Sequence, residues 1–303
     1  MEWLEVSVTG VENEAAEVVA EVLSRYVYRG VVIETGPDGW NAGRVVVRAY
    51  LPADDQTWSK KRGIKEALGH LNLVRPIPAP TFRSIAEKDW VEAWKERLDV
   101  LRIGQHIVIR PSWHEYVPGA EDVVIQLDPG MAFGTGLHPT TQMCLVALEE
   151  LGCVEAKALD LGTGSGILAI AAAKLGAECV LAVDNDPVAV KTARTNVTNN
   201  GVGETVRVVR GSLPAAPGSY DVVLVNILAR VIVEMMQEGL ATRVSPEGRL
   251  VATGIIVDQE SEVVASLEQG GLILAERRQI EDWVCLVAKR RQSSLDWTER
   301  LYL

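Results

Sequence analysis

Residues 159–168 read Leu-Asp-Leu-Gly-Thr-Gly-Ser-Gly-Ile-Leu, and this segment is the most informative about the architecture of the chain. It begins as a short apolar strand, passes through glycines at alternate positions, and continues into an apolar helix predicted over residues 167–175. Glycines permit positive φ angles and let the backbone approach a ligand closely. The start of a helix also offers backbone N–H groups that have no partner inside the helix. The stretch therefore predicts a strand–turn–helix unit that binds a ligand at its turn.

The spacing of the glycines narrows the kind of ligand. Gly162, Gly164 and Gly166 form Gly-x-Gly-x-Gly, whereas dinucleotide-binding proteins carry Gly-x-Gly-x-x-Gly and place a pyrophosphate against the helix start. A sulfonium nucleoside has no phosphate, but its amino-acid carboxylate can accept hydrogen bonds from the same N–H groups. The spacing favours an S-adenosylmethionine-dependent methyltransferase. A dinucleotide-dependent oxidoreductase, a non-catalytic binding module and a purely structural glycine turn stay as alternatives.

Two polar residues end later strands. Asp184 comes 22 residues after Gly162 and closes an apolar strand, where its carboxylate can accept hydrogen bonds from both ribose hydroxyls of a nucleoside. Asn226 ends the strand at residues 222–225. We expect that strand beside the first one, at the point where the strand order reverses. The amide oxygen of Asn226 can then accept a hydrogen bond from a substrate amine, although an Asn that only closes a turn is the alternative.

A loop rich in glycine and proline spans residues 128–141 and precedes an apolar helix predicted over 141–151. Ordering such a loop is costly, and costly ordered loops are often functional, although a simple glycine-rich connection is the alternative. We expect His138 to shape the loop and cap the helix. Its imidazole titrates near neutral pH, so a role as general base is the less favoured hypothesis. Asp186, which precedes Pro187, is expected to cap another helix.

The chain divides into a small N-terminal part and a larger C-terminal part. The first 85 residues or so have the order strand–helix–strand–strand–helix–strand, which is that of a ferredoxin-like α/β domain. The strands are expected near residues 4–8, 30–33, 44–51 and 81–85, and the helices over 14–28 and 55–71. Residues 86–105 form a candidate connector with Trp90 and Trp94 on one helical stripe. From residue 106 onward, strands and helices alternate, which predicts a parallel sheet covered on both faces.

The composition limits the partners. Apolar residues make up 48% and charged residues 23% of the chain, which is ordinary for a globular protein. The net charge is −11, from 30 basic and 41 acidic residues, so we expect no direct binding of nucleic acid, which needs a basic surface. No apolar run approaches the ~20 residues of a membrane helix, and the N-terminus has no secretory signal. We therefore expect a cytoplasmic protein, without a membrane partner and without a bound metal.

Four segments together carry a resemblance to a known family. The loop at residues 128–141, the turn at 159–166, Asp184 and the Asn-Ile-Leu-Ala stretch at 226–229 closely resemble the PrmA family of ribosomal protein methyltransferases. The resemblance covers residues 87–290 well and the earlier segment only as a small α/β domain. It implies a Rossmann-like class I methyltransferase domain that uses S-adenosylmethionine as its cofactor.

The resemblance also implies roles for individual residues. Thr141, Gly162, Asp184 and Asn226 are expected to contact the cofactor, together with Gly164 of the same turn. Asn226 is also the expected catalytic residue, because it borders the methyl-transfer site. Many amine methyltransferases carry Asn/Asp-Pro-Pro-aromatic here, whereas this chain has no aromatic residue after Asn226. Phe133 is the candidate to replace that ring beside the cofactor and the amine.

The substrate implied by the resemblance is large-subunit ribosomal protein eleven, methylated on lysine and N-terminal amines. Residues 1–85 are then expected to recognise the substrate, residues 86–105 to connect, and residues 106–303 to transfer the methyl group. Another protein, a nucleic acid or a small molecule stays open as the methyl acceptor.

Overall fold

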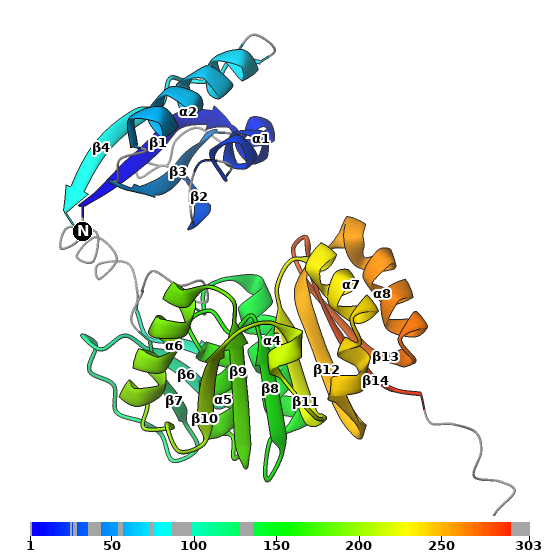
Figure 1. The fold of residues 1–303 in the computed structure, drawn as a ribbon. Coiled ribbons are helices and arrows are strands. Elements are labelled where there is room, and N and C mark those ends of the chain that lie inside the picture. Colours follow the sequence, from blue (N-terminus) through cyan, green and yellow to red (C-terminus); the bar gives the residue numbers. More distant parts are fainter. Residues whose placement is uncertain are drawn as a thin grey trace, which may run out of the picture. The chain divides into compact units, whose positions relative to one another are not determined.

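The computed structural model describes residues 2–24, 26, 29–35, 44–53, 57–72, 75–86, 99–127 and 136–291. The contacts divide the chain into two compact units, Met1–Leu98 and Asp99–Leu303, and each is described by itself (Figure 1). No helix within the described residues is long and apolar enough to span a membrane.

The N-terminal unit is a four-stranded antiparallel sheet with two helices. Along the chain it consists of β1 (Glu2–Glu12), α1 (Asn13–Ser24), β2 (Arg29–Thr35), β3 (Arg44–Pro52), α2 (Thr57–Asn72) and β4 (Thr81–Ala86). The strand order is β2-β3-β1-β4, and every neighbouring pair is antiparallel. This is the predicted ferredoxin-like arrangement.

Alternation in β1 contributes to how this unit closes, although Ser7 between Val6 and Val8 is also buried. Leu4, Val6 and Val8 are buried, whereas Thr9 is exposed, as expected when successive side chains of a strand point to opposite faces. The buried side chains share one core with apolar residues of α1 and α2. Helix α1 is shorter than predicted. It ends at Ser24, and the Tyr26 N–H then donates to the Leu23 carbonyl in a turn (3.0 Å).

The C-terminal unit is built on a seven-stranded sheet in the order β10-β9-β8-β11-β12-β14-β13. Its strands are β8 (Lys157–Leu161), β9 (Cys179–Asp184), β10 (Val206–Arg210), β11 (Tyr220–Asn226), β12 (Val244–Ile256), β13 (Leu272–Ile280) and β14 (Trp283–Arg290). Strands β8 to β12 run parallel, and β14 is antiparallel to both of its neighbours. The strand order reverses between β8 and β11, which is where open α/β sheets bind ligands.

Helices cover both faces of this sheet, as predicted. One core unites one face of the sheet with α4 (Pro139–Leu151), α5 (Ile167–Lys174) and α6 (Pro187–Asn199). A second core unites the other face with α7 (Ala229–Gln237) and α8 (Glu260–Gln269) (Figure 1). Three short 3-10 helices complete the unit: η1 (Leu213–Ala215), η2 (Leu240–Arg243) and η3 (Val257–Gln259).

A small three-stranded sheet precedes these elements and was not predicted. It consists of β5 (Leu101–Ile103), β6 (Ile107–Arg110) and β7 (Val123–Gln126), and its buried isoleucines join the first core. The side chain of Asn200 ties it to the end of α6: the Gln126 N–H donates to Asn200 Oδ1 (2.8 Å), and Asn200 Nδ2 donates to the Gln126 carbonyl (2.7 Å). The helix expected at residues 87–98, with Trp90 and Trp94, lies outside the described residues.

Candidate active site

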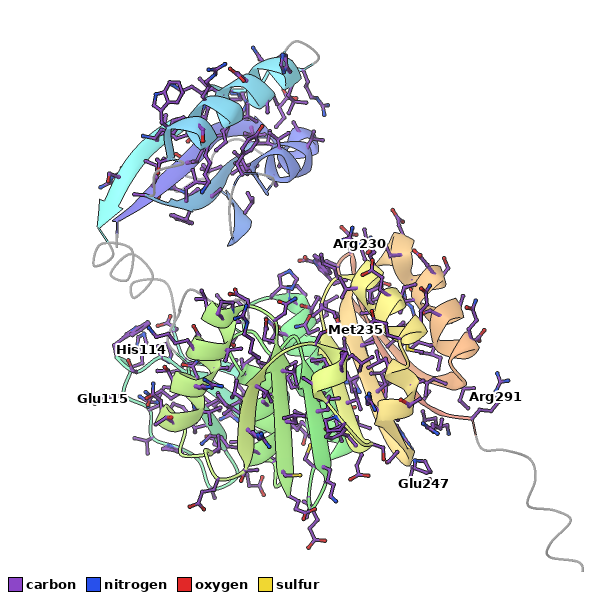
Figure 2. The ribbon with its side chains drawn as sticks, in the orientation of Figure 1. His114, Glu115, Arg230, Met235, Glu247 and Arg291 are labelled. Atoms are coloured by element: carbon purple, nitrogen blue, oxygen red, sulfur yellow. The ribbon has the colours of Figure 1, made fainter. Side chains whose placement is uncertain are left out.

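The residues with chemical potential gather at the carboxyl edge of the parallel strands. Strands β8, β9 and β11 are neighbours and end at Leu161, Asp184 and Asn226. In Figure 2, Arg230 lies at this edge, just beyond β11, and Glu247 lies at the opposite edge, near the start of β12. Parallel strands bring their carboxyl ends to one edge, which explains why residues far apart in sequence meet here.

The turn after β8 requires glycine. Gly162, Gly164 and Gly166 have φ angles of 76°, 56° and 86°, a region that residues with a side chain rarely adopt. A Cβ atom on Gly162 would lie 2.3 Å from Cγ2 of Ile227, so the end of β11 leaves no room for one. The Gly162 N–H donates to the Val183 carbonyl of β9 (2.8 Å), which ties the turn to the neighbouring strand.

Asp184 lies half-buried beside this turn. Its Oδ2 accepts a hydrogen bond from the Gly164 N–H and its Oδ1 accepts one from the Asp186 N–H, both at 2.9 Å. A carboxylate offers about four acceptor positions, so these two bonds fix the group and leave acceptor capacity for a ligand. Asp186 caps α6 as predicted, because its Oδ1 accepts from the Val188 N–H (2.8 Å).

Thr141 and Asn226 are brought into contact although 85 residues separate them. Asn226 Nδ2 donates to Thr141 Oγ1 at 3.3 Å. Thr141 is fully buried in the first turn of α4, and Asn226 is half-buried at the end of β11. Because Nδ2 is committed to Thr141, the amide is oriented, and its Oδ1 accepts no hydrogen bond from the described part of the chain. Among the described residues that oxygen has no donor, so it can accept a hydrogen bond from a ligand at the edge of the sheet.

Sequence reasoning missed Asp160, which is fully buried one residue before the end of β8. Its Oδ2 accepts from Thr163 Oγ1 (2.6 Å) and from the Ala169 N–H (3.2 Å), whereas its buried Oδ1 has no hydrogen-bond partner within the described structure. Burial raises the pKa of Asp160 to about 7, and the charge of Asp184 adds to the shift. A buried hydrogen-bond acceptor without a donor destabilises the folded protein unless a ligand supplies the donor. The available signal was an acidic residue inside an apolar strand.

His138 acts as the helix cap that the sequence predicts. It is the N-cap of α4, and its Nδ1 accepts from the Thr140 N–H (3.3 Å). The ring stands edge-on to Trp283 with the centroids 4.8 Å apart, and desolvation lowers the pKa of His138. Trp283, which the sequence did not single out, opens β14 and pairs with Ile256 at the end of β12. It therefore borders the same edge of the sheet.

The apolar residues near Asn226 are described only in part. Phe133 lies in residues 128–135, outside the described part of the chain, and its role stays a prediction. Of the two apolar residues after Asn226, Ile227 lies against Gly162, but Leu228 is 65% exposed and does not form a buried wall. Nowhere in the described ranges do three or more His, Cys, Asp or Glu side chains form a group that could hold a metal ion.

The reversed strand order, the antiparallel β14, the glycine turn and the residues at the strand ends define a class I methyltransferase fold. The sequence model of one family, described as "Ribosomal protein L11 methyltransferase (PrmA)", matches residues 2–291. The chain belongs to this family, as its sequence motifs predict.

Individual relatives agree with this assignment. The ribosomal protein L11 methyltransferase of Chloroflexus aurantiacus is 45% identical, over 96% of this chain and 98% of the relative. That of Herpetosiphon aurantiacus is 41% identical, over 96% and 99%. The crystal structure of ribosomal protein L11 methylase from Lactobacillus delbrueckii subsp. bulgaricus matches with a TM-score of 0.60 and 31% identity, over 64% of this chain and 100% of that one.

Proposed function

We propose that this protein transfers methyl groups from S-adenosylmethionine to lysine and N-terminal amines of ribosomal protein L11. The contact of Asn226 with Thr141 carries the proposal, because it leaves an oriented amide oxygen at the strand edge that also holds the glycine turn. The names of the relatives supply the substrate. A ribosomal substrate would place the activity in the cytoplasm.

The described residues fit S-adenosylmethionine at this edge. Gly162 and Gly164 let a ligand approach the backbone, and the half-buried carboxylate of Asp184 can accept from ribose hydroxyls. The partnerless Oδ1 of Asp160 is an acceptor for a cationic group nearby. When bound, the cofactor supplies a methyl group already activated by the sulfonium, so the protein has mainly to position the reactants.

The acceptor amine presents the harder chemical problem. A free lysine has a pKa of ~10.4, so reaching its neutral form at pH 7 costs about 4.6 kcal/mol. The Oδ1 of Asn226 can accept a hydrogen bond from the neutral amine and direct its lone pair toward the methyl group. Ile227 provides apolar surface beside it, which disfavours the charged amine. His138 already caps α4, so we assign the proton to solvent rather than to this imidazole.

Substrate selection is assigned to the N-terminal residues. Residues 1–85 would dock ribosomal protein L11, residues 86–105 would connect, and residues 106–303 would carry out the transfer. Two observations support this division. The N-terminal unit has a core of its own, and Thr141, Gly162, Asp184 and Asn226 all belong to the C-terminal unit.

The test is incubation of the purified protein with ribosomal protein L11 and labelled S-adenosylmethionine, followed by intact-protein and peptide mass spectrometry. We expect successive methyl additions on lysine and N-terminal amines. L11 with acetylated amines serves as the control and should receive none. If L11 carries no label, it is not the methyl acceptor. If the acetylated protein carries label, the methyl groups do not go to amines. A thermal shift produced by NAD but not by S-adenosylhomocysteine would refute the cofactor.

A further inference from the structure

Positive charge is concentrated on one helix of an otherwise acidic protein. The chain carries a net charge of −11. Helix α2, in contrast, holds Lys60, Lys61, Arg62 and Lys65 against the single acidic residue Glu66. The surface of this helix therefore differs in sign from the protein as a whole, and surface charge acts on partners locally.

The basic residues of α2 share a face with a tryptophan. Trp58, Lys61, Arg62 and Lys65 follow the spacing i, i+3, i+4, i+7, which places them on one side of a helix. The buried residues of the helix, Ile64 and Leu68, lie on another side and belong to the core. We call the stripe from Trp58 to Lys65 the α2 face.

Two lysines of the α2 face are held in place by an aromatic ring. The Nζ atoms of Lys61 and Lys65 lie 5.6 Å and 5.5 Å from the centroid of the Phe82 ring, which belongs to the edge strand β4. Ammonium groups at such distances are attracted to the ring face. Neither ammonium forms an ion pair with a carboxylate of the described residues. Their charges are thus oriented by the ring and, within the described residues, remain available to a ligand.

Packing against the ring of Phe82 would explain the positions of the two lysines. It would not explain why Trp58 is exposed. Trp58 is 71% exposed, the highest exposed fraction among the large hydrophobic residues described in the N-terminal unit. The guanidinium of Arg62 lies 6.0 Å from its centroid and also bonds to Glu66 Oε1 (2.7 Å). An exposed aromatic ring flanked by cations is the arrangement on which the bases of a single strand stack while its phosphates are neutralised.

We propose that the α2 face binds single-stranded nucleic acid. Lys61 and Lys65 would contact consecutive phosphates, and a base would stack on the indole of Trp58, which is the combination that non-sequence-specific single-strand binders use. An acidic protein segment would satisfy the cations but would offer no flat partner for the indole. This binding is independent of the methyl-transfer site, and it revises the expectation from net charge alone, because the charge is unevenly distributed.

The experiment uses the full-length protein and fluorescence anisotropy of a labelled oligouridylate of about 12 nucleotides, within the usual site size. The affinity is measured across a salt series. Competition with unlabelled RNA and unlabelled DNA of the same length then shows which of the two nucleic acids the protein prefers. The variant K61E/K65E should bind at least about tenfold more weakly and show a salt slope smaller by about 1.4, because two phosphate contacts are lost. W58A should bind about tenfold more weakly with the slope unchanged.

A matched control is K157E/K289E, which makes the same charge change at exposed positions of the C-terminal unit. It should retain wild-type affinity. K61M/K65M keeps the aliphatic stems over Phe82 and removes only the charges. It therefore tests the contribution of the phosphate contacts to affinity if the glutamate variant unfolds. The proposal is overturned if the wild type does not bind at low salt, or if the control loses as much affinity. It is also overturned if polyglutamate competes as well as RNA while W58A binds normally, because the surface would then fit an acidic protein.

Discussion

The two units of this protein are both α/β, but they differ in how many polar residues they bury and where these lie. The N-terminal sheet is antiparallel, and Ser7 is its one buried polar residue among those whose side chains are described. The C-terminal sheet is mostly parallel, and its buried polar residues include a group on β8, on the turn after it, at the start of α4 and on β12: Thr140, Thr141, Asp160, Thr163, Ser165 and Thr253.

The difference follows from topology. An antiparallel sheet distributes its strand ends between two edges, whereas parallel strands bring all of their carboxyl ends to one edge. Polar residues placed there support one another and remain reachable by a ligand. The contrast supports the proposal that the C-terminal unit carries out the chemistry and the N-terminal unit recognises the substrate, and each variant below tests one side of that proposal.

The largest expected effect comes from removing the N-terminal unit. Deletion of residues 1–98, at the boundary between the two units, should lower methylation of ribosomal protein L11 on the order of a thousandfold, because docking supplies effective concentration. Affinity for S-adenosylmethionine, measured by calorimetry, should be retained, since the C-terminal unit has its own cores. A truncated protein that methylates L11 at full efficiency would show that these residues do not dock the substrate. Lost cofactor affinity would show that the two units are not separable.

Within the C-terminal unit, Asn226→Ala should lower kcat on the order of a hundredfold. The amide positions the amine, and small misplacements of reacting groups cost about that factor. Cofactor affinity should change less. Single-turnover kinetics at saturating cofactor measure the step directly, and a wild-type rate would remove Asn226 from the transfer site. Thr141→Val, which deletes the hydroxyl that Asn226 contacts, should give a smaller loss of the same kind.

Asp184→Ala should weaken S-adenosylmethionine binding by about 1.5–3 kcal/mol, the usual range for a hydrogen bond to a charged group. Asp186→Ala is the matched control, two residues further along the chain. It removes the N-cap of α6 and should cost about 1 kcal/mol of stability while leaving affinity largely intact. Isothermal calorimetry and thermal melts separate the two effects. Equal affinities for both variants would contradict the ribose role of Asp184.

Much of this fold could be predicted from local pattern. Alternation in β1, glycines with positive φ after β8, and Asp186 before a proline each have one local physical cause that the sequence displays. The location of the candidate site at the carboxyl edge of the sheet could also be predicted, because Asp184 and Asn226 each close an apolar strand.

Pairings across long sequence distances could not be predicted in the same way. Thr141 entered the candidate site through family resemblance, since nothing local indicates its contact with Asn226. The three-stranded sheet was missed because its strands are only three or four residues long, too short to show a period. Asp160 was interpreted as part of a strand, because burial of a charged group depends on neighbours such as Ala169 that only the tertiary fold supplies.

The smallest expected effect concerns this buried acid. The folded-state pKa of Asp160 is raised from 3.8 to about 7, mainly by desolvation. The folded protein therefore binds a proton more tightly than the unfolded chain does. The group's contribution is most favourable below its unfolded pKa and declines as pH rises toward the folded value.

Between about pH 6 and about pH 8, this linkage should cost the ligand-free protein about 1 kcal/mol of unfolding free energy. Asp160→Asn keeps an oxygen to accept from Thr163 and Ala169 and removes the titration, so the variant should lose that part of the pH dependence. Denaturant unfolding of both proteins across this range measures the difference. Asp221→Asn, an exposed acid at the start of β11, is the control and should follow the wild type. If Asp160→Asn also follows the wild type, the carboxylate is ionised throughout this range and the unfilled acceptor beside the glycine turn must be satisfied by solvent.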